Sequence, residues 1–117
     1  MPDTPQDHLP LKPVDLELLL ALAHGDQHGY GLVQAVATHT DGLIVLDPGN
    51  LYRVIKRLLD TGLVAESGKR AATDAGERRR YYHLTTMGER VLAAELDRLR
   101  RLINLGSTRA VARKLAP

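Results

Sequence analysis

Apolar residues in the first third of the chain recur with the spacing of helices. Residues 14–24 are almost continuously aliphatic, and a helix that is apolar nearly all round belongs in the middle of a small core. Gly25-Asp26-Gln27 breaks this run. A second helix is expected from about His28 to Thr40, with Tyr30, Val33 and Val36 as its buried positions. Residues 1–13 hold four prolines and little periodicity, so we expect a flexible N-terminal arm.

The segment after Asp47 predicts a helix with two chemically different faces. Asp47 can cap the free N–H groups, Pro48 suits the first helical position, and Gly62 is a natural stop. One side, at about 100° per residue, carries Leu51, Val54, Ile55 and Leu58. The other side carries Asn50, Arg53, Lys56 and Arg57. A helix of this kind over residues 48–61 suits the major groove of DNA, although many solvated helices look similar.

Further along, β-prone runs predict a hairpin. Residues 63–67 and 80–84 are expected to be strands, joined by an exposed loop of small, polar and charged residues over 68–79. The run 43–46 predicts a further short strand before the two-faced helix.

A long helix is expected near the C-terminus. Thr86 has capping-box spacing to Glu89, with Thr85 as a rival cap, and the helix is expected to reach about Leu105. Gly106 is expected to end it, and residues 107–115 predict a short final helix. Four apolar residues of this helix are separated by four, three and four positions, the spacing of a coiled-coil seam: Leu92, Leu96, Leu99 and Ile103. This stripe could cover the domain's own core, but three earlier helices already provide one, so we interpret it as a dimer interface.

The order of these elements is typical of a winged helix-turn-helix followed by an extra helix. The fold class is therefore mainly α with a small β-hairpin (α+β). We expect a flexible N-terminal arm (1–13), a winged-helix DNA-binding domain (14–85), and a C-terminal dimerisation helix and tail (86–117). In such folds the third helix enters a groove and the hairpin, or wing, reaches the adjacent backbone. An isologous two-fold dimer would place two such helices about one DNA turn, roughly 34 Å, apart.

Charge is strongly segregated along the chain. Residues 1–52 hold one basic and seven acidic groups, net −6, whereas residues 53–117 hold fifteen basic and seven acidic groups, net +8. The two halves could neutralise each other across the fold, but segregation of this kind favours a polyanionic partner. The predicted hairpin concentrates the basic residues Lys69, Arg70, Arg78, Arg79 and Arg80 against Asp74 and Glu77. These cations suit DNA phosphates, the alternative being a loop that only aids solubility; Arg80 could instead pair with a carboxylate.

Four stretches of the chain resemble the PadR-like family of transcriptional regulators. They are His28-Gly29-Tyr30-Gly31-Leu32; Pro48-Gly49-Asn50-Leu51-Tyr52-Arg53; Leu58-x-x-x-Gly62-Leu63-Val64; and Arg78-Arg79-Arg80-Tyr81-Tyr82-His83-Leu84-Thr85-x-x-Gly88. The resemblance implies a dimeric winged-helix repressor whose C-terminal helix makes the dimer and whose DNA affinity is often controlled by a ligand. It also implies that the Tyr52 hydroxyl could reach a phosphate, the alternative being a half-buried packing tyrosine. The chain looks like a short member, without the larger C-terminal domain of longer ones.

Other classes of function have little support in the sequence. Residues 28–31 lack the spacing of a nucleotide-binding loop, and His24 and His28 are separated by a helix break, so no metal site or cofactor is expected. The serines are only Ser67 and Ser107, and no catalytic set can be assembled. A protein-interaction module and a ligand sensor remain as alternatives, although the absence of Trp and Phe disfavours a pocket that stacks flat drugs and leaves any small-molecule effector unknown. The sequence has no cysteine, no secretory signal and no apolar run of roughly 20 residues. These absences favour the cytoplasm over a membrane.

Overall fold

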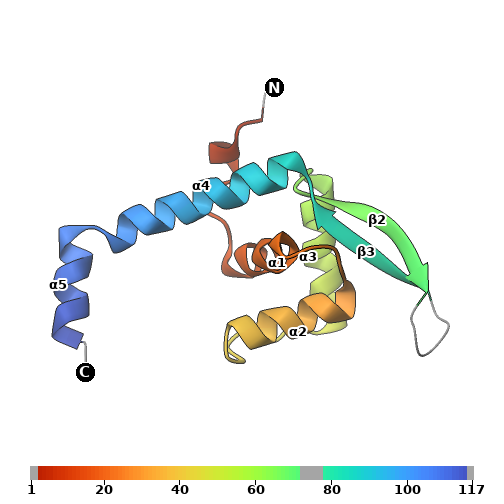
Figure 1. The fold of residues 1–117 in the computed structure, drawn as a ribbon, viewed down its shortest axis with the longest axis horizontal. Coiled ribbons are helices and arrows are strands. Elements are labelled where there is room, and N and C mark those ends of the chain that lie inside the picture. Colours follow the sequence, from red (N-terminus) through yellow and green to blue (C-terminus); the bar gives the residue numbers. More distant parts are fainter. Residues whose placement is uncertain (1–2, 72–77, 116–117) are drawn as a thin grey trace.

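The chain folds into helices packed beside a small sheet (Figure 1). The computed structural model describes residues 3–71 and 78–115. In chain order the elements are η1, a 3-10 helix (Pro5–His8), α1 (Pro13–Ala23), β1 (Gln27–His28), α2 (Gly29–His39), α3 (Pro48–Asp60), β2 (Val64–Ala71), β3 (Arg78–Leu84), α4 (Thr86–Ile103) and α5 (Gly106–Leu115). The strands form one antiparallel sheet in the order β1-β3-β2. The predicted winged-helix class, mainly α with a small β-hairpin, is confirmed.

The first helix lies at the centre of the core, as its aliphatic composition predicts. Leu18 and Leu19 have no exposed surface, and α1 contacts α2, α3, α4 and β3. Each fully buried leucine stabilises the fold by about 1.5–3 kcal/mol relative to an exposed one. Helix α1 is therefore the element against which the others are positioned.

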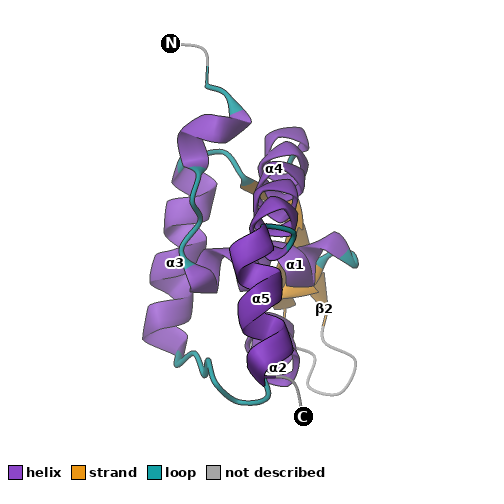
Figure 2. Ribbon diagram, turned by 90° about the vertical axis from the view of Figure 1, so that its left-hand side faces the viewer, coloured by secondary structure: helices purple, strands orange, loops and turns teal. Residues whose placement is uncertain are grey.

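Helix α3 forms for the local reasons read from its sequence. The Asp47 carboxylate accepts the backbone N–H of Asn50 at 2.8 Å, and Pro48 occupies the first turn. Gly62 ends the helix with a φ of 78°, in the left-handed region that glycine adopts without strain. The buried side chains are the four predicted ones, Leu51, Val54, Ile55 and Leu58. In the view turned by 90°, α3 runs along one edge of the molecule, clear of α5 (Figure 2).

The prediction of a short strand at residues 43–46 is wrong, and β1 supplies the third strand of the sheet instead. Gln27 and His28 pair with Tyr82 and Tyr81 of β3. Leu43 and Val45 are 86% and 73% exposed, and the backbone N–H of Ile44 donates to the Thr40 hydroxyl at 3.0 Å. The β propensity of this run is overridden because its backbone closes the turn between α2 and α3. Tyr30 was also expected to be buried but is 61% exposed, and Leu32 takes the core position.

The hairpin strands extend further than predicted. The expected loop over 68–79 contributes paired residues to both strands: Lys69, Arg70 and Ala71 pair with Arg80, Arg79 and Arg78. The register shifts between Glu66 and Gly68, and Gly68 has a φ of 99°. A bulge with a glycine in this conformation keeps the strands paired beyond the irregularity. Asp74 and Glu77, which the sequence placed in the hairpin, lie outside the described residues.

The C-terminal helices form an arm that leaves the body of the protein. Thr85, and not Thr86, caps α4, which ends at Ile103; Gly106 begins α5 rather than closing the long helix. Figure 1 shows α4 extending away from α1–α3 and α5 turning sharply from its end. The radius of gyration is 16.4 Å. A compact domain of this length would have about 13 Å, so the arm is a real departure from compactness.

The N-terminal segment has more structure than the flexible arm expected from the sequence. It contains η1, and Leu9 and Leu11 pack against the core. The backbone N–H of Leu11 donates to the Glu95 carboxylate at 2.7 Å, and Glu95, on α4, is 1% exposed. This buried carboxylate, which also accepts from the Arg98 guanidinium, anchors the segment to the arm.

Candidate nucleic-acid interface

The outer face of α3 carries a linked set of polar side chains. The second carboxylate oxygen of Asp47 accepts the side-chain amide of Asn50 at 2.9 Å. The Asn50 carbonyl oxygen in turn accepts from the Arg53 guanidinium. Asn50 and Arg53 are both exposed. The helix cap therefore holds an amide and a guanidinium side by side, the two groups that read adenine and guanine in the major groove.

The two remaining basic residues of α3 differ in their surroundings. Lys56 is paired with Asp60 at 2.9 Å, and both side chains are mostly exposed. Arg57 instead forms an ion pair with Asp15 of α1, whose side chain is only 10% exposed. Lys56 is thus free to turn to a ligand, whereas Arg57 is held against the body. The sequence placed both Lys56 and Arg57 on one polar face. The pairing of Arg57 with Asp15, which lies 42 residues away, could not be recognised from a local pattern.

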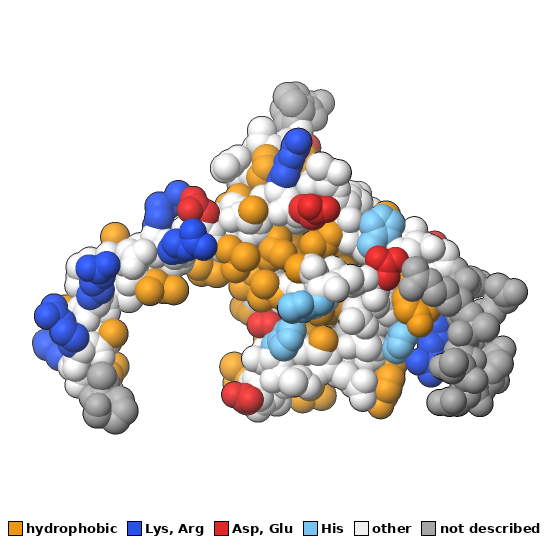
Figure 3. Space-filling model, in the orientation of Figure 1, with side chains coloured by type: hydrophobic (Ala, Val, Ile, Leu, Met, Phe, Trp, Pro, Cys, Tyr) orange, Lys and Arg blue, Asp and Glu red, His pale blue; other side chains and the backbone are white. Residues whose placement is uncertain are grey.

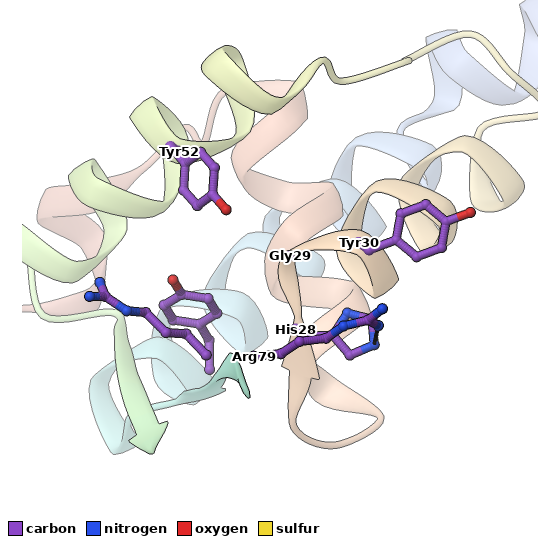
Figure 4. A pocket seen from close by; sticks show the side chains of 7 residues that line it. His28, Gly29, Tyr30, Tyr52 and Arg79 are labelled. Carbon is purple, nitrogen blue, oxygen red and sulfur yellow. Dashed lines mark hydrogen bonds between the residues drawn. The ribbon is translucent and has the colours of Figure 1, made fainter. Parts of the chain in front are cut away.

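Tyr52 lines a cleft between α3 and the sheet. The cleft has a volume of about 680 Å³, and its lining residues are His28, Gly29, Tyr30, Tyr52, Arg79, Arg80 and Tyr82. Tyr52 is 60% exposed and points into the space between α3 and the start of α2 (Figure 4). Burial raises the pKa of the Tyr82 hydroxyl, which therefore stays protonated at neutral pH. The cleft combines phenol hydroxyls with guanidinium groups, a chemistry that suits an anion.

The basic residues of the hairpin follow the two strands. Arg80 lies 3.5 Å from Glu66, the carboxylate pairing that the sequence left open, and its side chain is 61% exposed. Arg79 Nη1 lies 3.3 Å from His28 Nε2, and Figure 4 shows its side chain reaching the His28 ring. In the register Lys69 is opposite Arg80, Arg70 is opposite Arg79, and Arg78 is opposite Ala71. The backbone therefore brings these five cations onto one two-stranded ribbon.

His28 is a member of this cleft that sequence reasoning missed. Its Nδ1 accepts the backbone N–H of Gly31 at 3.0 Å and caps α2. Its ring meets the Tyr81 ring edge-on, with centroids 5.3 Å apart, and stacks with that of Tyr30 at 6.5 Å. Burial, and next the charge of Arg79, lower the pKa of His28, so the ring is neutral at neutral pH. Its place immediately before a glycine-rich helix start was the one available signal.

The predicted seam residues of α4 have different environments. Leu92 is 6% exposed and belongs to the core of the chain itself. Leu96 and Ile103 are 38% and 64% exposed, and Leu99 is half-buried. A second groove of about 600 Å³ runs beside them between the end of α1, β3 and α4; among its lining residues are His24, Asp26, His83, Glu89 and Leu96.

The described ranges 3–71 and 78–115 contain no group of three or more His, Cys, Asp or Glu side chains placed to hold a metal ion. None of the helices in these ranges has the length and apolar character required to cross a membrane.

A model of the transcriptional regulator PadR-like family matches residues 18–94 of the chain. This match covers the second half of α1, helices α2 and α3, the sheet and the first half of α4. No curated protein sequence matches the chain.

Solved structures share the fold. A transcriptional regulator from Clostridium thermocellum is 24% identical, with a TM-score of 0.64 over 89% of this chain and 93% of that one. A PadR family transcription regulator from Clostridium difficile is 21% identical, with a TM-score of 0.67 over 91% of this chain and 100% of that one. Bacillus subtilis PadR, solved in complex with operator DNA, is 19% identical, with a TM-score of 0.63 over 73% of this chain and 47% of that one.

Proposed function

The chain belongs to the PadR-like family of transcriptional regulators, and we propose that it is a cytoplasmic, homodimeric repressor that binds a pseudo-palindromic DNA operator. Helix α3 enters the major groove and the wing, the β2–β3 hairpin, contacts the adjacent backbone. The observation that carries this proposal is the linked set Asp47, Asn50 and Arg53 on the exposed face of α3. A guanidinium or amide that contacts a base edge in two places discriminates against the wrong base by about 1–3 kcal/mol.

The contacts divide by the kind of information they provide. Asn50 and Arg53 are the candidates for base contacts, because the cap holds them outward. Phosphate contacts fall to Tyr52 and Lys56 on α3 and to the wing residues Lys69, Arg70, Arg78, Arg79 and Arg80. Phosphate contacts give affinity and position, whereas base contacts give sequence choice. Arg57, which the sequence grouped with these residues, is assigned to the fold through its pairing with Asp15.

Support for the dimer comes from the apolar surface of the arm. Its exposed apolar side chains are Leu96, Leu102, Ile103, Leu105, Val111 and Leu115, between 38% and 78% exposed. Figure 3 shows apolar side chains on the inner side of the arm and cations along its outer side. An isolated helix of this length gains its stability from packing an apolar face, so the arm needs a partner surface. A second copy of the chain supplies it by two-fold symmetry, with the seam running from Leu96 through Leu99 to Ile103 rather than from Leu92.

Ligand control is a second candidate function, favoured by the groove between α1, β3 and α4. Leu96 lines this groove and also belongs to the proposed seam. A small-molecule effector bound there would contact both the winged-helix domain and the dimer arm.

Selection of bound duplexes from a random pool tests the proposed function. The expected result is a two-fold symmetric motif with half-sites about one helical turn apart. In a mobility-shift series, Arg53→Ala should lose more affinity for the selected duplex than for random duplex, by about 1–3 kcal/mol. A parent protein without preference for any duplex would overturn the proposal and favour a protein-interaction module that keeps the fold.

A further inference from the structure

The hydrogen bond that caps α2 determines which nitrogen of His28 carries the proton. Nδ1 accepts the backbone N–H of Gly31 at 3.0 Å, so in the neutral ring the proton is on Nε2. Nε2 is therefore a donor. It faces Arg79 Nη1 at 3.3 Å, and a guanidinium has donors but no acceptor.

Two donors that face each other cannot satisfy each other. In the other neutral tautomer the conflict moves to Gly31, whose N–H would then face an N–H, and a protonated ring would place a cation against Arg79. In every protonation state at least one contact of His28 joins donor to donor, and in the protonated ring both do. An acceptor from outside the chain, placed between Nε2 and the guanidinium, resolves the conflict and keeps the cap.

We propose that His28 and Arg79 jointly bind one oxygen of a DNA backbone phosphate. The inference rests on the proposed function and adds His28 to the wing contacts as a residue that nothing in the family match assigns. The pair joins the N-terminus of α2 to β3, so the bound phosphate fixes the position of the wing relative to the helix-turn-helix.

The surroundings favour a phosphate over other acceptors. Arg79 and Arg80 both line the cleft, and so do the hydroxyl-bearing residues Tyr52 and Tyr82. The cleft lies between α3 and the wing, which are the elements proposed to contact the major groove and the adjacent DNA backbone. The lowered pKa of His28 keeps the ring neutral, so its contribution is a hydrogen bond rather than a charge. Arg79 of β3 is the charged group that faces the ring; the rings of Tyr30 and Tyr81 and the N–H of Gly31 make its other described contacts.

The substitution His28→Asn tests the phosphate contact independently of the helix cap. Asparagine is among the best N-cap residues, so α2 keeps its first hydrogen bond, but its amide is too short to replace Nε2. We expect His28→Asn to lose about tenfold in affinity for the selected duplex without a change in salt dependence. Arg79→Ala should lose affinity and lower the salt slope by about 1. The double variant should lose less than the product of the two single losses, because both contacts share one oxygen.

A neutral methylphosphonate placed at one phosphate at a time locates the contact. The parent should lose affinity at one symmetric pair of positions where the variant carrying both His28→Asn and Arg79→Ala does not, while the other positions affect both proteins alike. His24→Asn is the matched control, since His24 is exposed and lies in the other groove, and it should resemble the parent.

Several outcomes would overturn this inference. One is an identical methylphosphonate profile in the parent and the double variant while both still bind the duplex. A second is an NMR titration of the His28 ring in which inorganic phosphate alone saturates the shift at the same concentration as DNA does. This result would indicate a site for free anions. The salt series on random duplex needs no operator: if Arg79→Ala and His28→Asn bind it as the parent does, the inference fails even without a selected motif. A parent that binds no duplex at all contradicts the proposed function instead.

Discussion

The carboxylate of Asp15 on α1 and the guanidinium of Arg57 on α3 form an ion pair at the edge of the core. The Asp15 side chain is 10% exposed and that of Arg57 is 38% exposed. The pair ties the helix proposed to read DNA to the central helix of the fold. It also removes one of the four polar side chains of α3 from the set available to a ligand.

Arg57→Ala should therefore destabilise the fold. It leaves a nearly buried carboxylate without its partner, and we expect a loss of about 1–3 kcal/mol in the free energy of unfolding, measured by urea denaturation. Lys56→Ala is the control, because the exposed Lys56–Asp60 pair contributes less than about 0.5 kcal/mol. Duplex affinity should show the reverse order, with Lys56→Ala losing more than Arg57→Ala. Equal stability losses in the two variants would contradict the assignment.

Gly88→Ala should loosen the joint between α4 and the hairpin. A Cβ at this position would lie 2.0 Å from the carbonyl oxygen of Leu63, which is backbone and cannot swing away. Overpacking of this kind costs about 1–3 kcal/mol, which chemical denaturation would detect. Gly106→Ala is the matched substitution at the start of α5, where a Cβ meets no atom within 4 Å, and it should shift stability by less than about 0.5 kcal/mol. The assignment fails if both substitutions are equally tolerated.

Stability should fall in acid through Glu95. The hydrogen bond from Arg98, opposed by burial and aided by the Leu11 N–H, lowers the pKa of Glu95. A carboxyl with a lowered folded-state pKa contributes stability above its unfolded value of about 4.3, and this is lost as the pH falls through the folded value. The unfolding free energy of the parent should therefore drop more steeply below about pH 4.3 than that of Glu95→Gln. Glu89→Gln, on an exposed site of the same helix, should follow the parent. Parallel curves for the parent and Glu95→Gln would disprove this role.

Charges among the exposed apolar residues of the arm should separate the dimer. Ile103→Glu combined with Val111→Glu would bury two carboxylates in the proposed interface, at a cost that a partner surface cannot compensate. Sedimentation equilibrium at micromolar concentration should show a dimer for the parent and a monomer for this variant, with unchanged helix content. Leu43→Glu is the control, since Leu43 is 86% exposed and lies away from the arm, and it should remain dimeric. A monomeric parent would remove the dimer from the proposal.

Local sequence patterns predicted most helices and strands well, because the interactions that start, stop and orient these elements are local. The cap at Asp47, the stop at Gly62 and the apolar face of α3 all act within one or two helical turns of the chain. The strand misplaced at residues 43–46 shows the limit of this reasoning. Propensity gives a segment's preference, but the backbone of residues 43–46 is used to close the turn between α2 and α3, and β1 takes the place beside β3.

The candidate site was predictable in type but not in detail. Charge segregation and the two-faced helix indicated a basic surface with polar groups from α3 and the hairpin. The partners of individual side chains could not be read in the same way: Arg57 meets Asp15 across 42 residues, and His28 meets Arg79 across 51. Long-range contacts of this kind depend on the packing of helices and sheet, which no single stretch of sequence specifies. Leu92 was misjudged for the same reason, since the depth of the core under α4 depends on how α1 lies beneath it.

The close approach of Gly88 to Leu63 has a consequence for the geometry of the whole regulator. It fixes the first turn of α4 to the root of the wing, while Ile103, fifteen residues later, belongs to the proposed contact with the second copy. Those fifteen residues span about 22 Å and just over four turns. In the proposed dimer, one residue added to α4 would rotate the partner by about 100° around the helix axis and move it by about 1.5 Å. The spacing and the angular phase of the two half-sites on DNA are then set by the length of a single helix.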